Sequence, residues 1–449
     1  MNIIIVGAGS VGFTAAEALS KVHDVLIVEE SPSRAEFAKS LLNVSVLCDN
    51  GTNPRVLESA IRRHKAEAVI ASTSRDDSNL FVCLMAKRVS PKIKTVSRIS
   101  DPDFIVKTSS EGVEGIDQLI SPEMITATKI SKLALLENAV DYESLVNMDM
   151  VLTTFKVSKE HTKIVGQVVI NLEIPPESTV VAVYRGEDVI LANETTELHV
   201  DDRICVLGSP KAIEDFNDMM GVTDDANEFV ILGGGVVGAH TARLLEGKKR
   251  YVKLIEEDEA VCRQLSKTFS NVIVVNANTV DPHILRSENV GRADALICVT
   301  DVDEKNLLAC MVAMNLGTKK VISRYSVREY EDIFQYTGIE SIIGYHRVVA
   351  NEITKTLISD DQAIMRMNHE GELFFSVTLT SQSKICNEHL GDVRLPEGVR
   401  IAAVVRDGRI IYPRMDTVFR NGDKVLLFTY MTKVSKLERL FGTNALSEM

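Results

Sequence analysis

The sequence lacks the features of membrane-spanning, secreted and nucleic-acid-binding proteins. Its longest uncharged stretch, residues 229–242, is shorter than the about 20 apolar residues that cross a bilayer. No basic segment precedes the first apolar residues, MNIIIVGAG, so no signal peptide is expected. Lysine and arginine number 50 against 63 acidic residues, a net charge of −13, whereas a nucleic-acid-binding face needs clustered basic side chains. We therefore expect a cytoplasmic protein without a nucleic-acid partner.

Signatures of catalysis and metal binding are also missing. The seven cysteines form no C-x-x-C pair and mostly lie in apolar stretches, which indicates reduced thiols. The nine histidines are scattered, and no Tyr-x-x-x-Lys, H-E-x-x-H, G-x-S-x-G or Walker sequence occurs. A dehydrogenase would need an acid or base beside its nicotinamide. We expect no catalytic residue and no metal site.

What the sequence does contain is an internal repeat. NIIIVGAGSVG at residues 2–12 and FVILGGGVVG at 229–238 each lead from an apolar segment into G-x-G-x-x-G. Gly7 and Gly233 lie 226 residues apart, and Thr52 and Thr279 lie 227 apart. Such a constant offset indicates two copies of one unit, which we call copy one and copy two.

Each copy is predicted to be an α/β unit in two parts. Short apolar segments alternate with amphipathic helices such as 52–65 and 76–89, which is typical of a doubly wound, Rossmann-like lobe with a parallel sheet. A crossover helix and a small α+β lobe (the β lobe) of short strands follow it. The predicted parts are 1–121, 122–140 and 141–221 in copy one and 227–344, 345–360 and 361–449 in copy two, with a polar linker at 221–228.

The glycine-rich turn of each copy is predicted to bind a dinucleotide. Its first glycine makes a tight turn, the second admits backbone close to the pyrophosphate, and the third packs helix on strand. The N-terminus of the helix then holds the phosphate. The predicted contacts are Gly7, Ala8, Gly9, Ser10, Val11 and Gly12 in copy one, and Gly233, Gly234, Gly235, Val236, Val237 and Gly238 in copy two.

An acidic residue ends the second strand of each copy. Glu29 lies 17 residues after Gly12, and Glu256 lies 18 after Gly238. A carboxylate at this position accepts hydrogen bonds from the adenosine ribose and repels a 2′-phosphate. It therefore favours NAD or NADH, or another adenine nucleotide such as ATP or ADP, over NADP. Lys253 beside the second acid leaves the selectivity of copy two open.

Further candidates lie where other strands end, on the side of the sheet that faces the ligand in such folds. The residues after the fourth strand could contact a ribose or cap the next helix, and the arginine that closes the fifth strand could neutralise phosphate or form a surface ion pair. The candidates are Thr52, Thr73, Ser74 and Arg98 in copy one, and Thr300, Asp301 and Arg324 in copy two, with Asn79 and Asn306 as weaker ones.

These motifs, in this order, resemble the RCK (KTN) nucleotide-binding domains that regulate potassium channels and transporters. The resemblance rests on both glycine turns, on D-D-S-N at 76–79, S-R-I-S at 97–100 and G-I-D-Q-L-I-S-P-E-M at 115–124. The segment L-P-x-G-x-x-I-x-A-x-x-R-x-G at 395–408 looks like the accompanying C-terminal ligand domain. Two such units in one chain are similar to the TrkA family, the NAD-binding regulatory subunits of Trk potassium uptake systems.

The resemblance implies a regulatory subunit and not an enzyme. It implies that the chain forms a homotetramer and docks on the cytoplasmic face of a TrkH-like integral membrane potassium channel or transporter. The apolar faces of the helices at 122–139 and 346–359 are expected to bridge lobes in this assembly; burial within one chain is the alternative. Two other functions stay open: an NAD-dependent oxidoreductase with an unrecognised substrate, and a nucleotide sensor with another kind of partner.

Overall fold

A computed structural model describes the chain apart from residues 22, 109–111, 146–148, 194, 222–226, 248–249, 358–363, 367–372, 430–436, 438–439 and 442–449. Most of the predicted linker and the end of the second crossover helix lie outside the described residues. The chain divides into two compact units, one made of Met1–Thr126 with Gly344–Asp360 and the other of Ala127–Ile343 with Asp361–Ser447.

The first unit contains a six-stranded parallel sheet in the order β3-β2-β1-β4-β5-β6. The central strand β1 is apolar and buried, with Ile5 beside Ile27 of β2 and Ile70 of β4. This order confirms the doubly wound fold predicted from the sequence. The strands are β1 (Asn2–Val6), β2 (Asp24–Glu29), β3 (Ser45–Cys48), β4 (Ala68–Ala71), β5 (Lys94–Arg98) and β6 (Gln118–Ile120).

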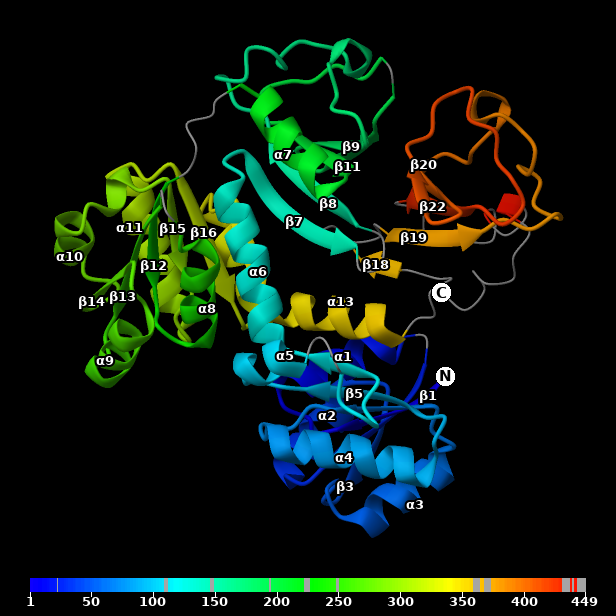
Figure 1. Cartoon of the computed structure of the whole chain (residues 1–449), viewed down its shortest axis with the longest axis vertical. Coiled ribbons are helices and arrows are strands. Elements are labelled where there is room, and N and C mark those ends of the chain that lie inside the picture. Colours follow the sequence, from blue (N-terminus) through cyan, green and yellow to red (C-terminus); the bar gives the residue numbers. More distant parts are fainter. Residues whose placement is uncertain are drawn as a thin grey trace. The chain divides into compact units, whose positions relative to one another are not determined.

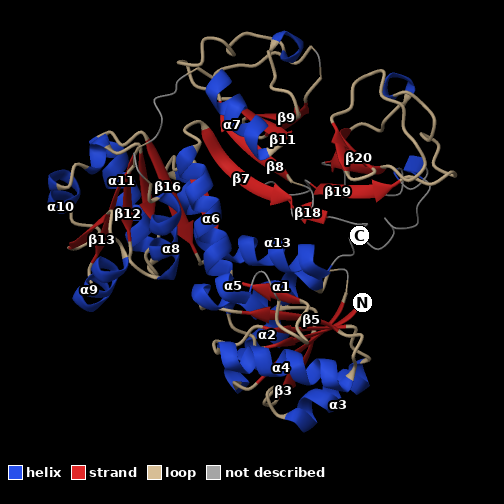
Figure 2. Cartoon of the chain, viewed as in Figure 1, coloured by secondary structure: helices blue, strands red, loops and turns tan. Residues whose placement is uncertain are grey.

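Helices cover both faces of this sheet (Figure 2). α3 (Pro54–His64) and α4 (Asp76–Val89) bury their apolar sides against one face. α1 (Ser10–Leu19), α2 (Pro32–Leu41) and α13 (Tyr345–Leu357) contribute to the core on the other face. α5 (Pro102–Thr108) follows β5.

The position of α13 differs from the expectation for its apolar face. This helix belongs to copy two, yet it lies beside α1 of copy one (Figure 1). Val349, Ile353 and Leu357 are buried in the same core as Ala15 and Leu19. Burial within one chain, the alternative given above, therefore holds for α13, and these side chains supply no evidence for association between chains.

The second unit contains a second six-stranded parallel sheet with the matching order β14-β13-β12-β15-β16-β17. Its strands are β12 (Glu228–Leu232), β13 (Tyr251–Glu256), β14 (Val272–Asn276), β15 (Ala295–Cys298), β16 (Lys320–Tyr325) and β17 (Ser341–Gly344). Its helices are α8 (Val236–Leu245), α9 (Glu259–Thr268), α10 (Pro282–Ser287), α11 (Asp303–Leu316) and α12 (Glu331–Tyr336).

The crossover helix α6 (Pro122–Leu135) ends before residue 140, the predicted end, and β7 begins at Ala139. Its carboxyl end is closed by a side chain from β16. Lys320 Nζ donates to the carbonyl oxygens of Leu133 at 2.6 Å and Leu136 at 2.7 Å, and also to that of Ala139. A cation is favoured at the negative end of a helix, but burial lowers the pKa of Lys320 to about 7.

The β lobes are antiparallel, and the two share one core. Copy one orders its strands β10-β9-β11-β8-β7, and copy two β18-β19-β22-β20-β21. Phe374 and Phe428 of copy two are buried in one cluster with Leu152 and Leu207 of copy one. The elements are β7 (Ala139–Leu145), β8 (Met150–Lys156), β9 (Ser178–Arg185), β10 (Asp188–Leu191), β11 (Arg203–Gly208), α7 (Pro210–Met219), β18 (Ile364–Arg366), β19 (Leu373–Thr378), β20 (Val399–Arg406), β21 (Arg409–Ile411) and β22 (Lys424–Thr429).

One ion pair recurs in both β lobes. Arg185 donates to the two carboxylate oxygens of Asp202 at 2.9 and 2.8 Å, and Arg406 donates to both oxygens of Asp423 at 2.7 Å. The side chains of Asp202 and Asp423 are each 1% exposed. The arginine of the 395–408 segment thus forms a bidentate pair that fastens the strands, and copy one has the same pair.

Candidate nucleotide-binding sites

The carboxyl ends of β1, β2, β4 and β5 surround a crevice of about 710 Å³ in copy one. A volume of this size falls in the range of small-molecule sites. Most of the predicted contacts line it: Gly7, Gly9, Ser10, Val11, Glu29, Thr52, Thr73, Ser74 and Arg98. Ala8 and Gly12 are predicted contacts that do not.

The glycine turn has the geometry that a bound phosphate requires. Gly7 has a φ of +98°, which an L side chain rarely adopts. A Cβ on Gly12 would lie 1.9 Å from the carbonyl oxygen of Gly7, so Gly12 packs helix against strand. A Cβ on Gly9 would meet no atom within 4 Å, and no side chain caps the amino end of α1. The first turn of α1 is therefore open to an anion.

Glu29 holds this turn in place. Glu29 is 4% exposed, and its carboxylate accepts hydrogen bonds from the backbone N–H of Ala8 at 2.6 Å and of Ser31 at 2.8 Å. Arg34 Nε lies 3.3 Å from the same carboxylate. Glu29 thus links the glycine turn to the β2–α2 loop, a structural contact that the spacing of the motif did not reveal. Its contact with a ribose stays a prediction.

A buried asparagine joins the ends of β4 and β5. Asn79 is fully buried; its Oδ1 accepts from the Thr73 N–H at 2.8 Å and from the Thr73 hydroxyl at 2.7 Å. Its Nδ2 donates to the carbonyl oxygen of Arg98 at 2.9 Å. Asn79, a weaker candidate from the sequence, therefore positions two residues that line the crevice.

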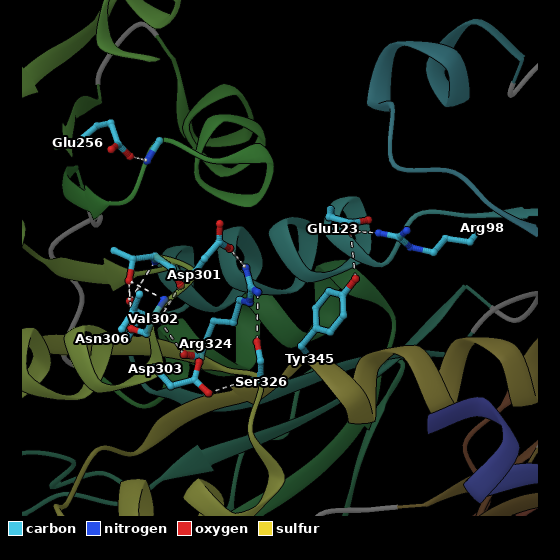
Figure 3. Close-up of polar contacts among 12 residues, drawn as sticks. Arg98, Glu123, Glu256, Asp301, Val302, Asp303, Asn306, Arg324, Ser326 and Tyr345 are labelled. Carbon is cyan, nitrogen blue, oxygen red and sulfur yellow. Dashed lines mark hydrogen bonds and ion pairs between the residues drawn. The ribbon is translucent and has the colours of Figure 1, made fainter. Parts of the chain in front are cut away.

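Arg98 connects the crevice to the amino ends of two helices (Figure 3). Arg98 Nη2 lies 2.7 Å from Glu123 Oε1 at the start of α6, and the hydroxyl of Tyr345 at the start of α13 donates to the same oxygen at 3.0 Å. The side chains of Arg98 and Glu123 are 16% and 14% exposed. Burial, the largest effect, lowers the pKa of Arg98, but the charges and hydrogen bonds of Glu123 and Tyr345 together raise it above its usual value. The ion pair is therefore largely shielded from water.

Copy two repeats the framework of the site. Glu256 accepts from the backbone N–H of Gly234 at 2.6 Å, and Asn306 accepts from the N–H and hydroxyl of Thr300 at 2.9 and 2.7 Å. A Cβ on Gly238 would again lie 1.9 Å from a carbonyl oxygen, that of Gly233. The two predicted sites therefore share one backbone design.

The polar contacts around the second site differ from those of the first. Arg324 lies 3.3 Å from Asp301, whose side chain is 89% exposed, and donates to the hydroxyl of Ser326 at 3.1 Å (Figure 3). Lys253, which left the selectivity of copy two open, pairs with Glu288 at 2.8 Å.

The described residues contain no cluster of three or more potential metal ligands. Within them, no helix is long and apolar enough to cross a membrane.

The two matching sheets and glycine turns, with an open crevice in copy one, define a tandem Rossmann-like protein. The TrkA-N domain model matches residues 3–122 and 229–345, and the TrkA-C domain model matches 152–221 and 374–442. The chain belongs to the TrkA family.

Full-length relatives support this assignment. The chain is 30% identical over 451 residues to the Trk system potassium uptake protein TrkA homolog 2 of Methanosarcina mazei, covering 98% of this chain and all of the relative. It is 28% identical over 462 residues to the Trk system potassium uptake protein TrkA of Vibrio alginolyticus, covering 98% of each.

Solved structures share the fold. The GsuK RCK domain aligns with a TM-score of 0.65 at 18% identity, covering all of this chain and 95% of that one. The GsuK channel bound to NAD aligns with a TM-score of 0.64 at 18% identity, covering all of this chain and 79% of that one.

Proposed function

We propose that this chain is the nucleotide-binding regulatory subunit of a potassium uptake system. The observation that carries the proposal is the tandem TrkA-N and TrkA-C match along one chain, combined with an open crevice at the amino end of α1 in copy one. Nucleotide binding would shift the equilibrium between two arrangements of a larger assembly by its difference in affinity for them.

The proposed ligand is NAD or NADH, with ATP and ADP as further candidates. The first turn of α1 would hold phosphate, and Glu29 would accept from the adenosine ribose with lone pairs left by its two backbone bonds. The fit is supported by the open space over Gly9 and by the arginines at positions 34, 75 and 98 that line the crevice. A GsuK channel solved with NAD supports the same ligand class.

The proposed partner is a TrkH-like integral membrane potassium channel or transporter, with this chain on its cytoplasmic face as a homo-oligomer, most simply a tetramer. Relatives named as Trk potassium uptake proteins support the potassium link. The proposed site in copy two comprises the equivalent residues around Gly235, Glu256 and Arg324. We also propose that each copy consists of a Rossmann-like lobe, a crossover helix and a β lobe with the bounds given above.

Reconstitution tests this function directly. The membrane partner is placed in liposomes, and potassium flux is measured with and without this protein and with NAD, NADH, ATP or ADP. We expect flux to change on addition of the protein and to change again with at least one nucleotide. Indifference to both additions, with folded protein shown to bind nucleotide, would contradict a regulatory role. Steady-state turnover of NADH with mixed carbonyl compounds, if observed, would favour an oxidoreductase.

A further inference from the structure

Three positions around the crevice of copy one have counterparts in copy two, and one of the three carries a different residue. In copy one, Glu30, Thr52 and Ser78 line the open crevice. Their counterparts in copy two, 227 residues later, are Glu257, Thr279 and Lys305. A serine in the first turn of α4 thus corresponds to a lysine in the first turn of α11.

In copy two these three side chains are joined. Lys305 Nζ lies 2.7 Å from Glu257 Oε2. The other oxygen, Glu257 Oε1, accepts from the hydroxyl and the backbone N–H of Thr279 at 3.2 and 3.3 Å. The bridge of Lys305, Glu257 and Thr279 therefore connects the end of β13, the loop after β14 and the start of α11. These are the equivalents of three walls of the open crevice in copy one.

Copy one bonds the same threonine differently. Thr52 donates through its N–H and its hydroxyl to Asn50 Oδ1 at 2.8 and 2.6 Å. Asn50 thus takes the place that Glu257 has in copy two, and Glu30 is exposed. In copy two the counterpart of Asn50 is Ala277, whose side chain cannot accept a hydrogen bond, and the neighbouring Asn278 accepts from the N–H of Val280 at 2.9 Å. Thr279 therefore bonds to Glu257 Oε1 in place of an asparagine, and Oε2 of the same carboxylate pairs with Lys305.

The charge around the crevices also differs. Arg34 and Arg75 line the crevice of copy one, and the residues 227 positions later are Val261 and Val302. Ser74 corresponds to Asp301. Copy two therefore has two fewer arginines, one more carboxylate and one more lysine at these positions. Arg34 and Arg75 are paired with Glu29 and Asp77 in copy one, as Lys305 is with Glu257 in copy two.

We propose that the two crevices are unequal sites for the same anionic nucleotide, with copy one strong and copy two weak, and that Lys305 and Val261 set the difference. This inference rests on the proposed function. A nucleotide entering copy two must open the Lys305–Glu257 bridge and finds no counterpart of Arg34. As nucleotide concentration rises, copy one fills first and copy two fills later.

The experiment uses the full chain with one crevice blocked. Gly9→Asp blocks copy one, and Gly235→Asp blocks copy two, because each places a carboxylate where phosphate would bind. A Cβ at either glycine meets no atom within 4 Å, so folding should be preserved. Calorimetry with NAD then reports one crevice at a time.

In the Gly9→Asp background we expect Lys305→Ser, which installs the copy-one residue, to tighten NAD binding about two- to fivefold, the scale of a partly exposed ion pair. Lys305→Arg keeps the bridge and is the matched control. Val261→Arg should tighten binding by a similar factor. In the Gly235→Asp background, Arg34→Val should weaken binding to copy one.

The outcomes separate the two proposals. This inference alone would be overturned by either of two results. One is that the two crevices bind NAD equally tightly when only the other crevice is blocked. The other is that neither Lys305→Ser nor Val261→Arg changes the affinity of copy two for NAD. NAD binding to copy one together with a gain in copy two from these substitutions would support it. No binding of NAD, NADH, ATP or ADP to either crevice would overturn the proposed function as well.

Discussion

The ion pair between Arg98 and Glu123 leads to a prediction that can be worked through from the structure. Glu123→Gln keeps the shape of the side chain but removes its charge, leaving the Arg98 guanidinium, 16% exposed, without its carboxylate. Breaking a buried pair costs about 3–5 kcal/mol. Because the amide oxygen can still accept a hydrogen bond and the site is not fully buried, we expect about 2 kcal/mol.

The assay is hydrogen exchange of the amides in α13 and at the start of α6, because a whole-chain unfolding midpoint is not defined for a protein of several parts. Tyr345→Phe removes only the 3.0 Å bond to Glu123 and should cost about 1 kcal/mol. Arg98→Met completes a double-mutant cycle with Glu123→Gln, and we expect a coupling of about 1–3 kcal/mol. Additive effects would refute the view that this pair fastens the two helix ends to the crevice.

The same substitution should affect ligand binding. Arg98 lines the crevice of copy one, and a phosphate that reaches it must compete with Glu123. We therefore expect Glu123→Gln to tighten NAD binding to copy one while it destabilises the unliganded protein. Weaker NAD binding to Glu123→Gln would contradict this expectation. It would show that Glu123 holds Arg98 in the position where Arg98 contacts the ligand, and does not compete with the ligand for Arg98.

Three further predictions concern single contacts. Gly12→Ala places a Cβ 1.9 Å from a backbone oxygen and should destabilise the first unit by about 3 kcal/mol, seen as faster hydrogen exchange of the α1 amides, whereas Gly9→Ala should exchange like the unmodified chain. Burial lowers the pKa of Lys320 from 10.5 to about 7, so the unfolded state binds more protons between these values, and the stability of the structure around the end of α6 should rise with pH from about 7 to 10.5. Hydrogen exchange of the amides at the carboxyl end of α6 should report this rise in the unmodified chain and lack it in Lys320→Met. Arg406→Met leaves the carboxylate of Asp423, 1% exposed, without its partner and should destabilise the second β lobe by about 3 kcal/mol, seen as faster exchange of β22 amides than in Arg406→Lys.

The parts of the fold that the sequence predicts are those governed by local pattern. Buried strands such as Ile3–Val6, glycines whose spacing fixes a turn, and the repeat itself are sufficient for two doubly wound lobes. The surface on which α13 packs could not be predicted. An apolar helix face such as Val349, Ile353 and Leu357 indicates that the face is buried, but not which other element covers it.

In the candidate sites, too, some contacts follow from the local sequence pattern and others do not. The spacing of Gly7, Gly9 and Glu29 correctly brings these residues to one crevice. The bridge between Lys305 and Glu257 joins residues 48 positions apart, and Glu123 meets Arg98 across 25 positions. Such pairs depend on how strand ends and helix starts meet in three dimensions, and nothing in the local sequence around any one of them specifies its partner.

The burial of α13 beside α1 has a consequence for biosynthesis. α1 ends at Leu19 and α13 begins at Tyr345, so at about 5–20 residues per second a ribosome needs about 15–65 s to make the second after the first. During that interval Ala15 and Leu19 lack part of their final cover. The first lobe therefore cannot complete its core during its own synthesis, and nascent chains that stop before residue 344 should be held by chaperones.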